Sequence, residues 1–335
     1  MKVLYSGYHN PHFISIPEYV ERAINSLGHK LEIYDDRRFL LPGRIRERIS
    51  FLQDMELSIL NNGLAARARN FKPDICIVNG GQRVSRSSVD RIKGYGAAVV
   101  LWTTDPPRDL DQFRQVVPYY DFVFAGGTEM IELLNGSGIK NLRWLPFACD
   151  PDYHHPVKVC ADDRKKYGND IAFVGSYYPN RLKIFEDIAD FDIGIWGPGW
   201  QNVPGASPIA KRVKKAGDIK PDEWVKIFCG ARIVVVVHYQ DGRIPCYQAS
   251  PKVFEALACG KFLLVDEQPD VKALFEDARH LVIFRDTKDL REKLNYYLAH
   301  DGEREMIAAS GYSEAVKKHT YRNRMAQMFS VIGRG

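Results

Sequence analysis

Short apolar runs alternate with segments of helical periodicity along the whole chain. The runs that predict buried strands cover residues 2–5, 30–34, 74–78, 97–102 and 122–125, and then 171–174, 192–196, 231–237, 261–265 and 281–284. Between them, apolar residues recur three or four positions apart, which predicts amphipathic helices. Alternation of strands with helices is typical of parallel sheets covered by helices, so we expect an α/β protein with doubly wound sheets.

The chain length of 335 residues favours two domains over one core. Residues 1–156 hold the first group of predicted strands, and residues 171–312 hold the second. Residues 157–170 between them are polar and aperiodic, which predicts a linker.

The composition excludes several classes of protein. No apolar run approaches the roughly 20 residues that span a bilayer, and the first strand begins too early for a signal peptide. Six cysteines lie scattered without paired spacing, which favours free thiols in the reducing cytoplasm. The net charge of +5 is mild, and no motif indicates nucleic-acid binding. The densest basic cluster, residues 211–215, is either a solvated face or a peripheral contact with an anionic membrane.

The most informative stretch begins at Ser250. Ser250 and Pro251 predict a helix start, since serine caps free N–H groups and proline fits the first turn. Gly260 predicts its end. Lys252 and Glu255 lie one turn apart at the N-terminal end, where a lysine and free N–H groups suit a phosphate and a carboxylate can bind sugar hydroxyls. The same two residues also fit an ordinary surface ion pair.

Other candidates in the second half follow predicted strands. Gly175 and Ser176 form a small-residue turn that can present N–H groups to a phosphate, with Arg181 placed to clamp a diphosphate. The loop beginning at Trp196 and Gly197 ends the next strand. His238 ends a central strand of β-branched residues, and either contacts the ligand or is held by hydrogen bonds.

In the first half, the residues that follow parallel strands are expected to line one crevice. They include Asn79, Asp105, Thr128 and Glu129, together with His9 in the first loop. Asp105 is the best candidate for a general base, although an aspartate before two prolines is also a common turn residue. Glu129 also fits a charge at a helix N-terminus, and His9 also fits a plain surface loop.

The sequence offers no convincing metal site. Asp109 and Asp111 have an Asp-x-Asp spacing that can bind a divalent cation. That motif should end an apolar strand, whereas here it follows two prolines and precedes a predicted helix. We therefore expect no metal ion.

Several motifs resemble those of known enzymes. The pattern Pro251-x-x-x-Glu255-Ala256-x-Ala258-x-Gly260 is similar to the donor-binding helix of GT-B glycosyltransferases. Residues 171–324 resemble the CgeB-like (spore-maturation-protein) glycosyltransferases in particular. The shared motifs are Val174-Gly175-Ser176, Phe254-Glu255-Ala256-x-Ala258-Cys259-Gly260, Tyr297-Leu298-Ala299-His300, His319-Thr320-Tyr321-x-x-Arg324, Trp102-x-x-Asp105-Pro106 and Leu145-Pro146-x-Ala148-x-Asp150-Pro151.

This resemblance implies a GT-B-like fold, in which two Rossmann-like domains face each other across a cleft. Residues 1–156 would form the acceptor-side domain and residues 171–312 the nucleotide-sugar-binding domain, and the final helix, here residues 313–335, would pack back on the first domain. It implies that Gly175, Ser176, Arg181, Trp196, Gly197, His238, Ser250, Lys252 and Glu255 bind a nucleoside-diphosphate sugar. The donor is then a substrate, no further cofactor is expected, and the acceptor is an unknown glycan, protein or lipid-linked molecule.

Two departures from the family pattern leave alternatives open. Many retaining GT-B enzymes have a second glutamate where this chain has Tyr247, and relatives often have arginine in place of Lys252. A lysine loses the bidentate fork of arginine. In an inverting enzyme Asp105 would deprotonate the acceptor, whereas a retaining enzyme needs no such base. The alternatives to a transferase are a non-catalytic nucleotide-sugar-binding or spore-coat-like protein and a nucleotide-sugar epimerase.

Overall fold

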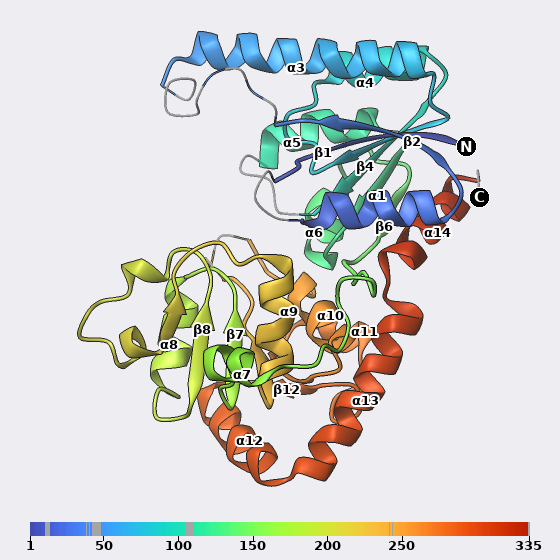
Figure 1. The fold of residues 1–335 in the computed structure, drawn as a ribbon. Helices are drawn as coiled ribbons and strands as arrows, with labels where there is room; N and C mark the ends of the chain where they lie inside the picture. The colour runs from blue at the N-terminus through green and yellow to red at the C-terminus, as the bar shows by residue number, and fades with distance from the viewer. Residues whose placement is uncertain are drawn as a thin grey trace. The chain divides into compact units, whose positions relative to one another are not determined.

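The computed structural model describes residues 1–10, 14–37, 39, 41, 48–104, 110–240, 242 and 244–333. The chain divides into two compact units. Unit 1 combines Met1–Pro146 with Arg324–Gly335, and unit 2 is Phe147–Asn323. Each unit contains a six-stranded parallel sheet with helices packed on it (Figure 1). The predicted α/β class with two Rossmann-like domains is therefore confirmed.

The sheet of unit 1 has the order β2-β1-β3-β4-β5-β6. Its strands are almost wholly buried at the centre and consist of apolar, often β-branched residues, as expected for a sheet covered on both faces. They are β1 (Lys2–Gly7), β2 (Lys30–Asp35), β3 (Ile75–Asn79), β4 (Ala98–Thr103), β5 (Phe122–Ala125) and β6 (Leu142–Trp144). The helices are α1 (Ile16–Ser26), α3 (Ser50–Phe71), α4 (Arg86–Gly94), α5 (Leu110–Val116) and α6 (Thr128–Leu134).

The last helix, α14 (Tyr321–Ile332), belongs mostly to unit 1. Nε of Arg324 donates to the carbonyl of Pro146 at 3.0 Å. Met325, Met328 and Phe329 are buried, and the Phe329 ring meets His29 edge-on at 4.8 Å between centroids. Helix α14 thus packs on unit 1 near His29 and Pro146.

The sheet of unit 2 has the order β12-β11-β10-β7-β8-β9. Its strands are β7 (Ile171–Val174), β8 (Ile193–Trp196), β9 (Val213–Lys215), β10 (Ile233–Val236), β11 (Phe262–Asp266) and β12 (Val282–Phe284). The helices are α7 (Ala161–Tyr167), α8 (Pro179–Glu186), α9 (Pro221–Gly230), α10 (Pro251–Ala258), α11 (Pro269–Leu274), α12 (Thr287–Ala299) and α13 (Asp301–Lys318).

Each sheet reverses its direction of growth at one point. The reversal lies between β1 and β3 in unit 1 and between β7 and β10 in unit 2. In open α/β sheets ligands bind beyond the carboxyl ends of the strands at this switch point. The topology therefore marks two places for binding, one in each unit.

Some local expectations differ from the structure. Residues 157–170, expected to be an irregular linker, contain helix α7, which starts at Cys160 as its N-cap. The basic run 211–215 contains strand β9, which pairs with β8. Within it, Arg212 donates to the carbonyl of Ala189 and Nζ of Lys215 pairs with Glu223 at 2.6 Å. Fewer of its charges therefore point to solvent than the sequence suggests.

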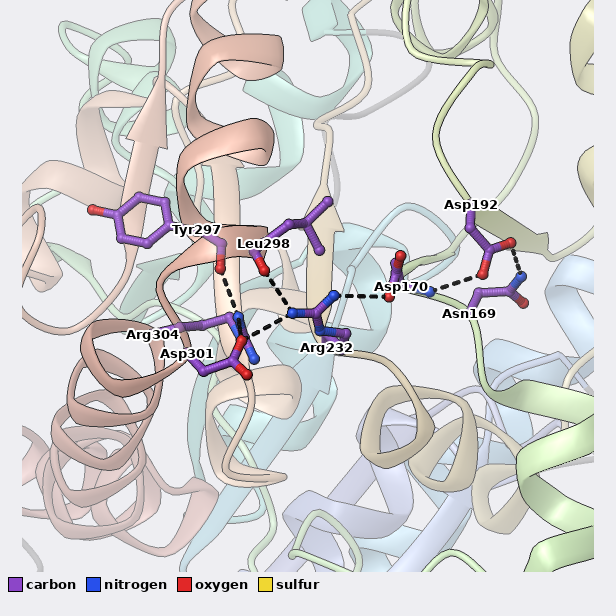
Figure 2. A network of polar contacts seen from close by, with 8 residues as sticks. All are labelled: Asn169, Asp170, Asp192, Arg232, Tyr297, Leu298, Asp301 and Arg304. Carbon is purple, nitrogen blue, oxygen red and sulfur yellow. Dashed lines mark hydrogen bonds and ion pairs between the residues drawn. The ribbon is translucent and has the colours of Figure 1, made fainter.

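A polar network lies at the amino-terminal ends of β7, β8 and β10 in the second sheet (Figure 2). Arg232 is its centre: its guanidinium contacts Asp170 at 3.2 Å, Asp301 at 2.9 Å and the carbonyl of Leu298 at 2.6 Å. The buried Arg304 adds a bond to the carbonyl of Tyr297 at 2.6 Å. This network links the amino-terminal ends of these strands to α12 and α13, on the side of the sheet opposite the carboxyl ends of the strands.

Within the described part of the chain, no helix combines the length and the apolar character that a membrane crossing requires.

Candidate functional site

Helix α10 begins at the residues that the sequence predicted. Oγ of Ser250, the N-cap, accepts the N–H of Lys252 at 3.4 Å, and Pro251 occupies the first turn. The rest of the helix is buried from Val253 to Ala258, and Gly260 follows it with a φ of 69°. The N-terminus of the helix thus lies at the carboxyl ends of the strands, where His238, which follows β10, accepts the N–H of the N-cap Ser250.

Lys252 and Glu255 form an ion pair on this helix. Nζ of Lys252 lies 3.2 Å from Oε2 of Glu255, whose side chain is only 2% exposed. Burial raises the pKa of Glu255 and lowers the pKa of Lys252, and in each case the charge of the partner offsets part of the shift. Nζ of Lys252 also lies 3.5 Å from the centre of the Trp224 ring, a cation–π contact. The lysine is therefore held close to the glutamate by two independent contacts.

The buried His154 also lies close to Glu255. Nδ1 of His154 accepts the N–H of Asp150 at 3.0 Å, so Nε2 carries the proton. Nε2 lies 3.9 Å from Oε1 of Glu255. Burial, together with the charge of Lys252, lowers the pKa of His154 to about 3, so the ring is neutral.

His238 links two strand ends to the start of α10. Its Nδ1 contacts Oδ1 of Asp266 at 2.6 Å, and its Nε2 accepts the backbone N–H of Ser250 at 2.9 Å. Since Nε2 is an acceptor, the proton resides on Nδ1. Burial alone would raise the pKa of Asp266, but His238 and Gln268 outweigh it and the pKa is lowered. Both ring nitrogens are thus engaged within the protein, and His238 acts here as a positioning residue.

The loops after β7 and β8 approach each other closely. The N–H of Gly175 donates to the carbonyl of Trp196 at 2.9 Å, and Nε1 of Trp200 donates to the carbonyl of Gly175 at 2.8 Å. A Cβ on Gly197 would lie 2.2 Å from the carbonyl oxygen of Gly175, and the φ of Gly197 is 141°. Only glycine fits there. The side chain of Trp196 is buried and takes no part in the surface of this loop.

Arg181 spans the switch point of the second sheet. Its Nε donates to the carbonyl of Val237 and its Nη1 to the carbonyl of Ser176, both at 2.8 Å. The guanidinium stacks on the Tyr178 ring at 4.9 Å, and burial lowers its pKa. Arg181 therefore joins the ends of β7 and β10, and two of its three nitrogens are already used for this purpose.

Two of the predicted catalytic residues, His9 and Glu129, lie in unit 1 in different surroundings. Nε2 of His9 contacts Oε1 of Glu21, and although burial lowers the pKa of His9, this carboxylate raises it above its usual value. Glu129 is buried in the first turn of α6, and its carboxylate folds back over Gly127, the N-cap. This place suits a charge at a helix N-terminus. Asp105 and Asp109 lie outside the described residues.

The sequence did not lead us to predict His154, which lies near Glu255, or Asp266, which contacts His238. Asp266 ends β11, next to the strand that ends in His238, so the rule of strand ends would have found it. His154 precedes α7 and carries no local pattern that distinguishes it from a surface histidine. Among the described residues, no group of histidine, cysteine or acidic side chains could hold a metal ion. The six cysteines are free thiols.

Two sequence comparisons relate this chain to known proteins. A family model described as "Glycosyl transferase-like" matches residues 181–330, which include α10 and the strands around it. The chain is 24% identical over 268 residues to the spore protein CgeB of Bacillus subtilis (strain 168), covering 75% of this chain and 80% of that protein. The chain is similar to CgeB over three quarters of its length. The predicted resemblance is therefore confirmed.

Solved structures show that this CgeB-like chain has the fold of GT-B glycosyltransferases. Anabaena Alr3699/HepE in complex with UDP and glucose superposes with a TM-score of 0.66 at 12% identity, covering 99% of both chains. Sucrose-phosphate synthase from Thermosynechococcus elongatus gives a TM-score of 0.71 at 13% identity, covering 99% of this chain and 98% of that one. A glycosyltransferase from Rickettsia africae gives 0.70 at 11% identity.

Proposed function

We propose that this protein is a glycosyltransferase that moves a sugar from a nucleoside-diphosphate sugar to an acceptor hydroxyl. The observation that carries the proposal is the start of α10, where Lys252 lies 3.2 Å from a glutamate that is almost completely buried. Burial of a carboxylate costs free energy of folding unless a cation or hydrogen-bond donors compensate its charge. Here a cation, a carboxylate and a helix N-terminus lie at the carboxyl ends of the strands, within the region that has the family match.

In this proposal the diphosphate of the donor lies at the positive end of the α10 dipole and binds the ammonium group of Lys252. Glu255 accepts hydrogen bonds from the ribose hydroxyls, as the resemblance to GT-B enzymes implies. Negative charge grows on the diphosphate as the glycosidic bond breaks, and a fixed dipole and cation stabilise it. The same positive groups take over the role that a divalent metal has in other transferases, so we propose a reaction without a metal ion.

The remaining residues of the site have supporting roles. His238, with Asp266 behind it, holds the first residue of α10 in place. Arg181 and the glycines at 175 and 197 shape the strand-end loops that would surround the diphosphate and the base. Asp105 is proposed as general base for an inverting reaction, on the basis of the sequence resemblance.

The experiment is a thermal-shift measurement with nucleotides. UDP is the first probe, because Alr3699/HepE was solved with it. A ligand at about 100 times its Kd stabilises a protein by about 2.7 kcal/mol, which gives a measurable rise in Tm. We expect this rise for the natural sequence and its loss in Glu255→Gln. The matched control is Glu276→Gln, which removes another glutamate that pairs with a cation one turn away, Arg279 at 2.7 Å, in the same unit.

Three outcomes separate the candidate functions. Failure of UDP and the other nucleoside diphosphates to shift Tm contradicts the proposal. Binding without sugar transfer to any acceptor supports a non-catalytic nucleotide-sugar-binding protein. Consumption of a nucleotide sugar with no acceptor present supports an epimerase.

A further inference from the structure

Two thiol groups meet at the C-terminal ends of α9 and α10. Cys229 lies in the last turn of α9, and Cys259 is the C-cap of α10. Sγ of Cys229 lies 3.8 Å from the carbonyl oxygen of Cys259, and the two thiols hydrogen-bond to each other. A disulfide requires the two Cβ atoms to lie about 4 Å apart, so side chains that are already in contact can form one with little movement.

The two cysteines differ in their access to solvent. Cys229 is partly exposed, whereas the side chain of Cys259 is only 1% exposed. A reagent in solution therefore reaches Cys229 first and Cys259 only through it. An accessible thiol that reacts first, next to a second thiol that resolves the product, is the arrangement of redox-active cysteine pairs.

The surroundings of Cys229 favour its thiolate. Its Sγ accepts the N–H of Val157 at 3.4 Å, and Nζ of Lys261 donates to its backbone carbonyl at 3.4 Å. The hydrogen bond from Cys259, helped by Val157 and Lys261, lowers the pKa of Cys229 to about 7, although burial opposes this shift. The same bond raises the pKa of Cys259 well above its usual value. At neutral pH Cys229 is therefore the nucleophile, and Cys259 keeps its proton.

We propose that Cys229 is a modification site for low-molecular-weight disulfides, and that it passes the modification on to Cys259 as an internal disulfide bond. The thiolate of Cys229 attacks one sulfur of the small disulfide, whose S–S bond breaks, and the released thiolate takes a proton from water. Cys259 then gives its proton to water, and its sulfur attacks Sγ of Cys229. The second half of the reagent leaves and is protonated. Two protein thiols are thus oxidised, and one small disulfide is reduced to two thiols.

The bridge would join α9 to the helix that carries the ion pair of the candidate site. The two helices already meet near their N-terminal ends, where Nζ of Lys252 lies 3.5 Å from the centre of the Trp224 ring. The ring closed by the bridge, residues 229–259, contains β10, His238 and the whole of α10. Because such a cross-link restricts the unfolded chain, the oxidised protein should unfold at a higher urea concentration than the reduced protein. The proposal does not rest on the proposed function.

The test is a peptide map of the full chain after incubation with glutathione disulfide at neutral pH. Remaining thiols are alkylated, and the protein is digested without reduction and analysed by mass spectrometry. We expect a peptide pair that joins Cys229 to Cys259. Cys259→Ser should stop at the mixed disulfide, with glutathione held on Cys229. The matched control is Cys160→Ser, which removes an exposed thiol of the same unit whose Sγ lies 3.2 Å from the carboxylate of Asp163, and it should form the bridge as the natural sequence does.

Three results would overturn the proposal. They are the absence of the bridge in the natural sequence, glutathione that stays on Cys229 in the natural sequence, and a bridge from Cys229 to another cysteine. The map of the natural sequence decides this even if a variant fails to fold. As a second measurement, the pH at which iodoacetamide modifies Cys229 at half its maximal rate should rise in Cys259→Ala, because that variant removes the hydrogen bond. An unchanged pH would contradict the pairing of the two thiols.

Discussion

Nε2 of His238 accepts the backbone N–H of Ser250 at 2.9 Å, and this bond joins the end of β10 to the first residue of α10. The opposite ring nitrogen contacts Asp266, at the end of β11, at 2.6 Å. One side chain therefore sets the position of a helix N-terminus relative to two parallel strands. Any molecule that binds at the N-terminus of α10 depends on this arrangement without touching the histidine.

His238→Ala should weaken UDP binding through the helix. The change leaves the N–H of Ser250 without its acceptor and should cost about 1–3 kcal/mol of stability. The control is His280→Ala, since Nδ1 of His280 accepts the N–H of Glu276 at 3.2 Å, also within unit 2 and also buried. Calorimetry should show at least tenfold weaker UDP binding for His238→Ala and unchanged binding for His280→Ala. Equal affinity in both variants contradicts the positioning role.

The ion pair on α10 should be strongly non-additive. Lys252→Met leaves Glu255 buried and unpaired, and such a loss costs about 3 kcal/mol or more. Glu255→Gln should cost less, because Lys252 keeps its contact with Trp224. The double variant should be more stable than the sum of the two effects predicts by at least about 1 kcal/mol, as measured by urea unfolding. Additive effects would mean that the two groups do not interact.

Asp36→Asn should stabilise the protein at neutral pH. Burial raises the pKa of this group from 3.8 in its unperturbed form to about 6 in the folded state, so the folded state is the better proton acceptor. Its stabilising contribution is present below pH 4 and is lost as the pH rises through 6. A shift of this size corresponds to an upper limit of about 3 kcal/mol. The asparagine variant should therefore unfold at higher urea than the natural sequence at pH 7.5, and the difference should shrink toward pH 4.

Gly197→Ala should disrupt the loops of the second sheet. The added methyl group would lie 2.2 Å from the carbonyl oxygen of Gly175, at a φ that disfavours any side chain. We expect a loss of about 3 kcal/mol or more and a smaller UDP shift. Gly205→Ala is the control: a Cβ there meets nothing within 4 Å, so its cost should stay within about 0.5 kcal/mol. Equal stability of the two variants contradicts this reading of the turn.

Features with a local cause could be predicted from the sequence. Ser250 and Gly260 mark the ends of α10 because capping depends on residues within one turn. The strands β7 and β10 are recognisable because a fully covered strand is apolar at successive positions. The sequence could also have placed Asp36 at a strand end, because it directly follows β2, just as Asn79 ends β3.

Contacts between distant residues could not be predicted in the same way. Asp266 lies 28 positions after His238, and only the register of β10 beside β11 brings the two strand ends together. Lys252 and Glu255 are adjacent on any helix, but the sequence does not say that Glu255 is buried or that Trp224 covers the lysine. The two bonds of Arg181 to carbonyl groups likewise follow from the sheet order and not from a motif.

The pairing of Arg324 with Pro146 has a consequence for how the protein is made. Unit 1 takes its last helix from the end of the chain, whereas unit 2 is continuous from Phe147 to Asn323. During synthesis, unit 2 can therefore mature on the ribosome while the first 146 residues still await Met325, Met328 and Phe329. A stop codon before Arg324 would leave that early half with an open apolar surface, exposed to chaperones and proteases.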